Sequence, residues 1–210
     1  MNKGEVEKMN LVCDSDQWSD YLKETEEVDY SDPSIAALTA RLSAEASDPI
    51  EIIRRAFEYV RDEINHSRDI QSTRITCAAS EVLKFQEGIC YAKANLLSAI
   101  LRRAGIPTGF CYQRLTLGDT PDTGYCIHAL NAVYVSEYDR WIRLDARGNK
   151  PGVQAEFSLH EERLAFPIRP EYEEFDYGTI YAEPHPKTIE TLRSNTSCVD
   201  MYLHGLPQAL

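Results

Sequence analysis

The hydrophobic pattern of the chain changes period near Pro107. Upstream, apolar residues recur every three or four positions, as on the buried face of a helix. The clearest such stripe consists of Ile53, Phe57, Val60 and Ile64. Downstream, residues 109–115 form an aromatic-rich segment bounded by turn-forming residues, and two similar segments follow at 126–135 and 140–145. Helices that precede antiparallel strands indicate an α+β domain.

Three helices can be placed from their end signals. Asp32 and Asp48 each precede a proline, which predicts helices that begin at residues 33 and 49 with an aspartate cap. A third helix is expected to begin near Cys90. Gly105 and Pro107 end it, because glycine accepts the left-handed conformation and proline cannot continue a helix.

The length of 210 residues favours a single domain with extensions. We expect an acidic, helical N-terminal extension over 1–47 and a catalytic core over 48–150. Residues 151–210, with a short helix near 187–192, are expected to complete the same domain.

The net charge of −12 argues against nucleic acid or an anionic membrane surface as a partner. The chain has no run of 18 apolar residues, and residues 1–7 lack the apolar segment of a signal peptide. These features predict a cytoplasmic protein. Its oligomeric state stays open.

Six cysteines are present at positions 13, 77, 90, 111, 126 and 198. None forms a C-x-x-C pair, so we expect neither a zinc site nor another metal or cofactor. A disulfide framework is typical of short exported chains, which this one does not resemble. Most of these thiols are expected to be small buried hydrophobic groups.

Cys90 differs because it lies at the predicted start of a helix. Unpaired amides and the helix dipole give this end partial positive charge, which favours a thiolate. The Cys90 amide would also supply half of an oxyanion hole. An ordinary buried cysteine is the alternative.

A predicted hairpin brings His128 and Asp145 to one face of a sheet. If residues 136–139 form the loop, Val135 pairs with Arg140 and Asp145 lies opposite Leu130. His128 then lies diagonal to Asp145, about 7–8 Å away between backbones, and the two side chains can meet. A cysteine nucleophile, a histidine and an orienting aspartate are the groups that thiol acyl transfer requires.

Three blocks resemble transglutaminase-like domains. They are Gly-Ile-Cys-Tyr-Ala-Lys-Ala at 88–94, His-Ala-Leu-Asn-Ala-Val-Tyr at 128–134 and Trp-Ile-Arg-Leu-Asp at 141–145. The resemblance covers about residues 48–150 and is closest to bacterial members described as candidate cysteine proteases. It implies a papain-like core whose nucleophile helix packs on an antiparallel sheet. It also implies that Cys90 is the nucleophile, His128 the general base and acid, and Asp145 the orienting group.

Five further residues are candidates for the oxyanion hole or the cleft: Gln86, Tyr91, Tyr112, Gln113 and Trp141. Each has a structural alternative. A glutamine such as Gln86 can simply cap or flank a helix, and most aromatic residues in such strands belong to the core.

We expect an enzyme that hydrolyses a peptide or amide through a thioester. Transfer of the acyl group to a primary amine, as in protein cross-linking, is the first alternative. A non-catalytic binding module with the same fold is the second.

Overall fold

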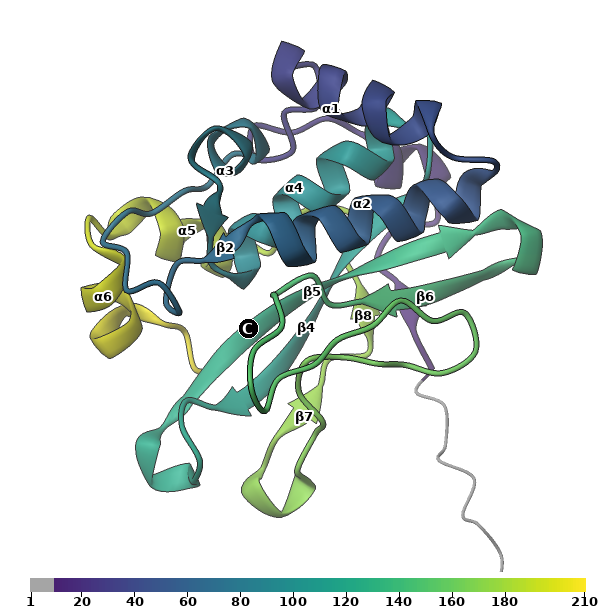
Figure 1. Cartoon of the computed structure of the whole chain (residues 1–210). Coiled ribbons are helices and arrows are strands. Elements are labelled where there is room, and N and C mark those ends of the chain that lie inside the picture. The colour runs from purple at the N-terminus through teal and green to yellow at the C-terminus, as the bar shows by residue number, and fades with distance from the viewer. Residues whose placement is uncertain (1–9) are drawn as a thin grey trace, which may run out of the picture.

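The computed structural model describes residues 10–210 and contains a central helix packed on a curved antiparallel sheet (Figure 1). The start of the chain, for which we expect no signal sequence, lies outside the described residues. The α-helices are α1 (Pro33–Ala44), α2 (Pro49–Glu63), α3 (Ala79–Phe85), α4 (Cys90–Arg103), α5 (Pro186–Ser194) and α6 (Cys198–Asp200). The strands are β1 (Val12–Cys13), β2 (Asn65–His66), β3 (Glu87–Gly88), β4 (Thr108–Thr116), β5 (Tyr125–Val135), β6 (Arg140–Leu144), β7 (Phe175–Asp176) and β8 (Thr179–Ile180). The α+β prediction is confirmed.

The helix boundaries follow the expected end signals. The Asp32 side chain accepts from the backbone N–H of Ser34, and that of Asp48 from Glu51, so each aspartate satisfies an unpaired amide of its helix. Gly105 has a φ of +78°, the left-handed conformation that ends α4. The short α3 was missed because its seven residues carry no comparable pair of signals.

The main sheet has the order β6-β5-β4-β7, with neighbouring strands antiparallel. Val135 pairs with Arg140 and Asn131 with Leu144, which is the register expected for a loop at 136–139. A register shifted by one residue would turn His128 to the other face. The turn Ser136–Tyr138 (η3) joins β5 to β6.

The two faces of the sheet are covered differently. One face packs on α4 through residues such as Phe110, Ile127 and Val133. Asn131 also faces α4 and donates to Ala94 and Ser98, opposite to His128 as parity predicts. Figure 1 shows α2 running beside α4 on this side of the sheet.

The N-terminal segment covers the other face. The turn Trp18–Leu22 (η1) packs against the sheet, where Trp18 stacks on Trp141 with 5.7 Å between ring centroids. The buried Tyr21 hydroxyl lies in hydrogen-bond range of Asp14 and the backbone oxygen of Ile180. Strand β1 pairs with β8.

The subdivision into 1–47, 48–150 and 151–210 stays a prediction. Side chains from all three ranges enter one buried cluster, for example Val28, Leu97 and Leu192. None of the helices in residues 10–210 combines the length and apolar character needed to cross a membrane.

Candidate active site

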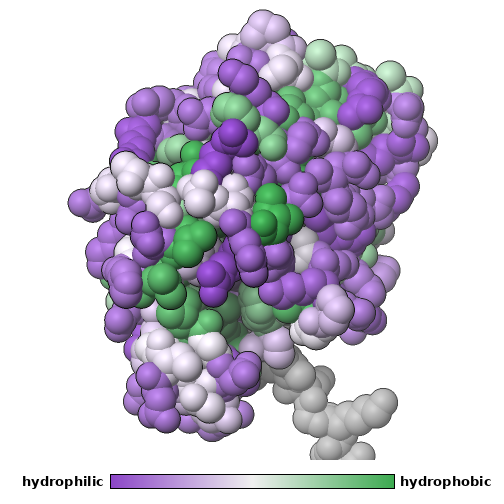
Figure 2. Space-filling view, turned by 60° about the vertical axis from the view of Figure 1, so that its left-hand side comes forward, coloured by the Kyte–Doolittle hydropathy of each residue, from purple (hydrophilic) through white to green (hydrophobic). Residues whose placement is uncertain are grey.

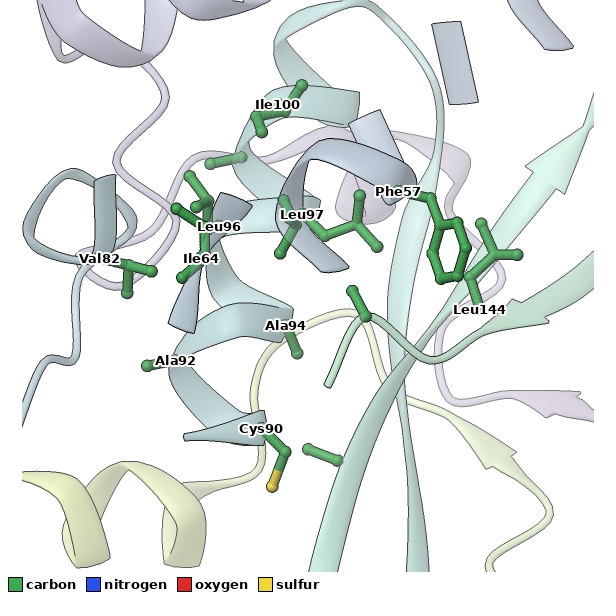
Figure 3. Packing of buried hydrophobic residues seen from close by; sticks show 14 of the residues in the cluster. Phe57, Ile64, Val82, Cys90, Ala92, Ala94, Leu96, Leu97, Ile100 and Leu144 are labelled. Carbon is green, nitrogen blue, oxygen red and sulfur yellow. The ribbon is translucent and has the colours of Figure 1, made fainter. Parts of the chain in front are cut away.

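Cys90 is the first residue of α4, and its side chain is 6% exposed. The preceding residue, Ile89, is extended and provides no side-chain cap, so the amides of the first turn have no side-chain partner there. Figure 3 shows the Cys90 sulfur projecting beyond the helix start, away from the packed Leu96, Leu97 and Ile100. The thiol is therefore buried in a position from which it can meet a ligand at the helix end.

The glycine before this helix has a packing role. A Cβ at Gly88 would lie 3.1 Å from Thr76 Oγ1 and 3.2 Å from the Cβ of Ala92. Strand β3, which contains Gly88, pairs in parallel with β2, so that His66 lies opposite Gly88. The close packing places His66 beside the segment that leads into Cys90.

His128 on β5 contacts Asp145, which directly follows β6. The distance from His128 Nε2 to Asp145 Oδ2 is 2.8 Å. Asp145 is 1% exposed and accepts backbone N–H groups from Arg147 and Ala165. Burial raises the pKa of Asp145, but the His128 ring and these donors outweigh burial and hold that pKa below its usual range.

The surroundings of His128 favour the charged imidazolium. Burial lowers the pKa of His128, whereas the Asp145 carboxylate and then the Cys90 sulfur raise it, and the result is a pKa of about 10. The Phe166 ring meets the imidazole edge to face, with 5.1 Å between centroids and an interplanar angle of 88°. Since Nε2 contacts Asp145, Nδ1 is the ring nitrogen that is available to exchange a proton with the Cys90 sulfur.

A pocket of about 660 Å³ adjoins these residues. Its regular wall is built from the start of α4 (89–91) and from β5 (126–128). Its irregular wall comes from the loop 147–169 and from the short C-terminal helix η5 (Met201–Gly205) with Leu206. Figure 2, in which the side bearing α5 and α6 comes forward, shows hydrophobic residues among polar ones over the middle and lower part of that face, with a further group near its upper edge. None of residues 10–47 lines the pocket, so the described part of the N-terminal segment does not cover it.

Two of the five further candidates lie beside these residues. Tyr91 lines the pocket, but its hydroxyl already donates to the Ile127 carbonyl oxygen at 2.8 Å. Gln113 pairs with His128 across the β4–β5 ladder, and its amide nitrogen donates to Asp176.

The other three candidates lie in structural contacts. The Gln86 amide donates to the Leu83 carbonyl oxygen at the end of α3. The Tyr112 hydroxyl is buried and accepts from the His185 backbone. Trp141 packs in the aromatic cluster with Trp18, so Phe166, and not Trp141, is the ring against His128.

The site includes residues that the sequence did not reveal. His66 and Tyr202 line the pocket, with His66 Nε2 3.3 Å from the Tyr202 hydroxyl oxygen. Phe166 also comes from a loop without a periodic pattern. No sequence signal marks His66 as a site residue. Its only hint is that His66 and Gly88 each follow a helix by a short extended segment, and these two segments pair.

Lys93 is fully buried one turn after Cys90. Its ammonium donates to the carbonyl oxygen of Ile64 and lies 3.5 Å from that of Arg61, at the C-terminal end of α2. Burial, followed by repulsion from Arg147, lowers the pKa of Lys93 to about 7. The contact fixes the nucleophile end of α4 to α2.

Among residues 10–210, no three His, Cys, Asp or Glu side chains are grouped so that they could hold a metal ion. The six cysteines are free thiols.

Comparison with known proteins gives a family match over the region that contains the site. The model of the transglutaminase-like superfamily matches residues 36–146. No curated protein matches the chain.

Solved structures give a distant match to the fold. A protein of Cytophaga hutchinsonii described as a candidate cysteine protease has 17% sequence identity and a TM-score of 0.51. The match covers 67% of this chain but 46% of that one, so the present chain spans less than half of its relative. The periplasmic domain of TgpA from Pseudomonas aeruginosa has 17% identity and a TM-score of 0.45, with 60% of this chain and 45% of that chain covered.

Proposed function

The chain belongs to the transglutaminase-like superfamily, and from this premise we propose that it hydrolyses an amide bond with Cys90, His128 and Asp145. The observation that carries the proposal is the buried contact of 2.8 Å between His128 and Asp145, next to a cysteine at a helix start. The resemblance of the sequence blocks to the family supports the same three roles. The substrate class is a peptide or another amide.

In the proposed reaction the Cys90 thiolate attacks the carbonyl carbon of the amide. The C–N bond breaks, and the imidazolium of His128 gives its proton to the departing amine, which leaves a thioester on Cys90. The neutral His128 then takes a proton from water, and the resulting hydroxide attacks the thioester. The acid leaves, the thiolate returns, and the proton stays on His128.

Asp145 acts on this cycle through His128. Its carboxylate accepts from Nε2, which fixes the tautomer and stabilises the imidazolium. The raised pKa of His128 means that the imidazolium prevails at neutral pH, so a proton is available for the departing amine.

The Cys90 backbone N–H would stabilise the negative oxygen of the tetrahedral intermediate. As the first residue of α4 it has no acceptor within the helix. A donor in such a position stabilises the negative charge that develops during attack. Loss of one such donor slows catalysis by about 10²–10³.

The same site could pass the acyl group to a primary amine. We propose hydrolysis because water, unlike an amine, needs no binding site of its own beyond the pocket of about 660 Å³ that adjoins Cys90. A binding module without chemistry is the second alternative.

One assay separates the three functions. A library of glutamine- and asparagine-containing peptides is incubated with the protein, and both ammonia release and incorporation of a biotinylated primary amine are followed. Hydrolysis predicts release without amine, cross-linking predicts release that depends on amine, and a binding module predicts neither. Peptide-bond cleavage is read by mass spectrometry in the same samples.

The matched controls are Cys90→Ala and Cys126→Ala. Cys126 also lines the pocket, so the pair tests one thiol against its neighbour in the same cavity. Activity that survives in Cys90→Ala, or that is lost equally in both variants, would contradict the proposed role of Cys90.

A further inference from the structure

The charge of the pocket differs from that of the chain. The sequence has 34 acidic and 22 basic side chains. The charged side chains that line the pocket are basic in four cases and acidic in two: Arg68, Arg147, Lys150 and Arg169 against Asp119 and Glu174. On a chain with a net charge of −12, a pocket with excess positive charge next to the nucleophile is a local reversal.

Two of these cations pair with one carboxylate. Arg147 donates to both oxygens of Asp69, at 2.5 and 2.8 Å, and the Lys150 ammonium donates to Oδ1 at 2.7 Å. Arg68, the neighbour of Asp69 in the chain, is exposed and lies over the Tyr202 ring, 5.4 Å from its centroid. It takes part in none of the ion pairs within residues 10–210. Asp69 therefore balances one of the two charges that it contacts. Arg68 adds a further positive charge, and Asp119 adds one negative charge to the pocket.

The fourth cation is already compensated. Arg169 pairs with Glu174 at 2.5 Å, and Glu174 also accepts from the backbone and the hydroxyl of Thr116. The excess charge therefore belongs to the side of the pocket with Arg68 and Lys150.

A buried histidine adjoins the same cavity. His66 is 5% exposed, and its Nδ1 has no hydrogen-bond partner among the described residues. Burial, then the charge of Arg147, holds the pKa of His66 well below its usual range, so the ring is neutral. The ring therefore adds no charge to this wall of the pocket.

We propose that Arg68 and Lys150 form an anion subsite, and that the substrate carries a carboxylate in addition to the reacting carbonyl. This inference rests on the proposed function, because it names the substrate class for the same nucleophile. Arg68 supplies an exposed charge, and Lys150 supplies a second one that can turn from Asp69.

The test compares two alkylating reagents of nearly equal size. Iodoacetate is an anion and iodoacetamide is neutral, and in both cases the Cys90 thiolate displaces iodide and forms a carbon–sulfur bond. The rate of each is measured at Cys90 by mass spectrometry at low salt. The ratio of the iodoacetate rate to the iodoacetamide rate reports the attraction of the pocket for a carboxylate. His128 also attracts iodoacetate, so the informative quantity is the change of the ratio in variants.

We expect the ratio to fall about two-fold in Arg68→Gln, about two-fold in Lys150→Gln and about four-fold in the double variant, as for charges at roughly 8 Å in water. Salt at about 0.5 M should reduce the differences, because it screens exposed charges. Arg103→Gln is the control, since this exposed arginine ends α4 at the opposite end from Cys90. Its ratio should equal that of the wild type.

Two outcomes separate the inference from the function on which it rests. Preferential labelling of Cys90 by iodoacetamide, with a ratio that stays at the wild-type value in the double variant, would overturn the anion subsite alone. No preferential labelling of Cys90 in the wild type would contradict the proposed function itself.

A second arm identifies the source of the carboxylate. N-acetylglutamate α-amide carries it on the side chain, N-acetylglutamine carries it at the C-terminus, and N-acetylglutamine amide is neutral. The subsite predicts that one of the two anions protects Cys90 from iodoacetamide at lower concentration than the neutral compound. Equal protection by all three would contradict it.

Discussion

The two walls of the pocket are built in different ways. The regular wall holds Cys90 and His128 on a helix start and a strand, with Asp145 directly after the next strand. The irregular wall supplies Phe166 and Arg147 from the loop 147–169 and Tyr202 from the short C-terminal helix η5. The groups proposed for bond breaking are thus fixed by hydrogen-bonded elements. The groups proposed to bind the substrate carboxylate, Arg68 after β2 and Lys150 in the loop 147–169, lie outside helices and strands, where change is tolerated more easily.

The first prediction breaks the regular wall. In Asp145→Asn we expect the alkylation rate of Cys90 at pH 7 to fall up to about 30-fold, because without the orienting carboxylate the thiolate is less stabilised and an ordinary thiol is only about 3% ionised at this pH. The pKa of His128 should fall from about 10. The alkaline limb of the pH–rate profile for amide hydrolysis, which requires the imidazolium, should therefore move to lower pH.

The same substitution has a consequence for stability. His128 has its pKa raised on folding, so it contributes stability that is present below about pH 6.5 and is lost as the pH rises through about 10. Asp145→Asn should remove that pH dependence of stability.

Asp122→Asn, at an exposed acid on the turn Pro121–Thr123, is the control. A rate and an alkaline limb equal to the wild type would exclude the proposed role of Asp145.

The second prediction concerns the attachment of that wall to α2. Between about pH 7 and 10 the unfolded chain binds a proton at Lys93 that the folded chain does not, so folding should become more favourable as the pH rises. Relative to Lys93→Met, the wild type should gain up to about 1.4 kcal/mol per pH unit in free energy of unfolding. Urea denaturation at several pH values measures this slope.

Lys84→Met provides the comparison for an exposed lysine on α3. Parallel pH slopes for the wild type and Lys93→Met would mean that Lys93 titrates as an ordinary lysine.

The third prediction breaks the irregular wall where it touches the regular one. Phe166→Ala should lower the Cys90 alkylation rate about three- to ten-fold, because an edge-to-face aromatic contact contributes about 0.5–1.5 kcal/mol and here orients His128. Phe175→Ala, at a 43% exposed phenylalanine on β7, should leave the rate unchanged. Equal rates in Phe166→Ala and the wild type would show that the loop does not orient His128.

The fourth prediction sharpens the comparison with the face of the sheet away from α4. Tyr21→Phe removes a buried hydroxyl from Asp14 and from Ile180, which should cost about 1 kcal/mol of stability. The Cys90 alkylation rate should not change, since residues 10–47 do not line the pocket. A slower rate at full folding would connect this face to the site.

The regular wall could be predicted because its signals are local. The helix start at Cys90, the hairpin at 136–139 and the alternation along β5 fix where His128 and Asp145 point. The strand register determines that His128 and Asp145 share one face of the sheet, since side chains alternate at every residue of a strand.

The irregular wall could not be predicted, because nothing in residues 147–169 is periodic. Phe166 reaches His128 through a loop whose path depends on long-range contacts, such as the Ala165 amide on Asp145. The burial of Lys93 against α2 and the stacking of Trp141 on Trp18 are likewise properties of tertiary packing, so the local sequence did not decide between the alternatives for Trp141.

The most direct test of the account is competitive alkylation of the folded wild-type protein with limiting iodoacetamide at pH 6, followed by quantification of all six cysteines. The account predicts that Cys90 is modified well ahead of the other five, and that this lead disappears in His128→Ala. Uniform slow modification of all six thiols, or an unchanged lead in His128→Ala, would contradict it.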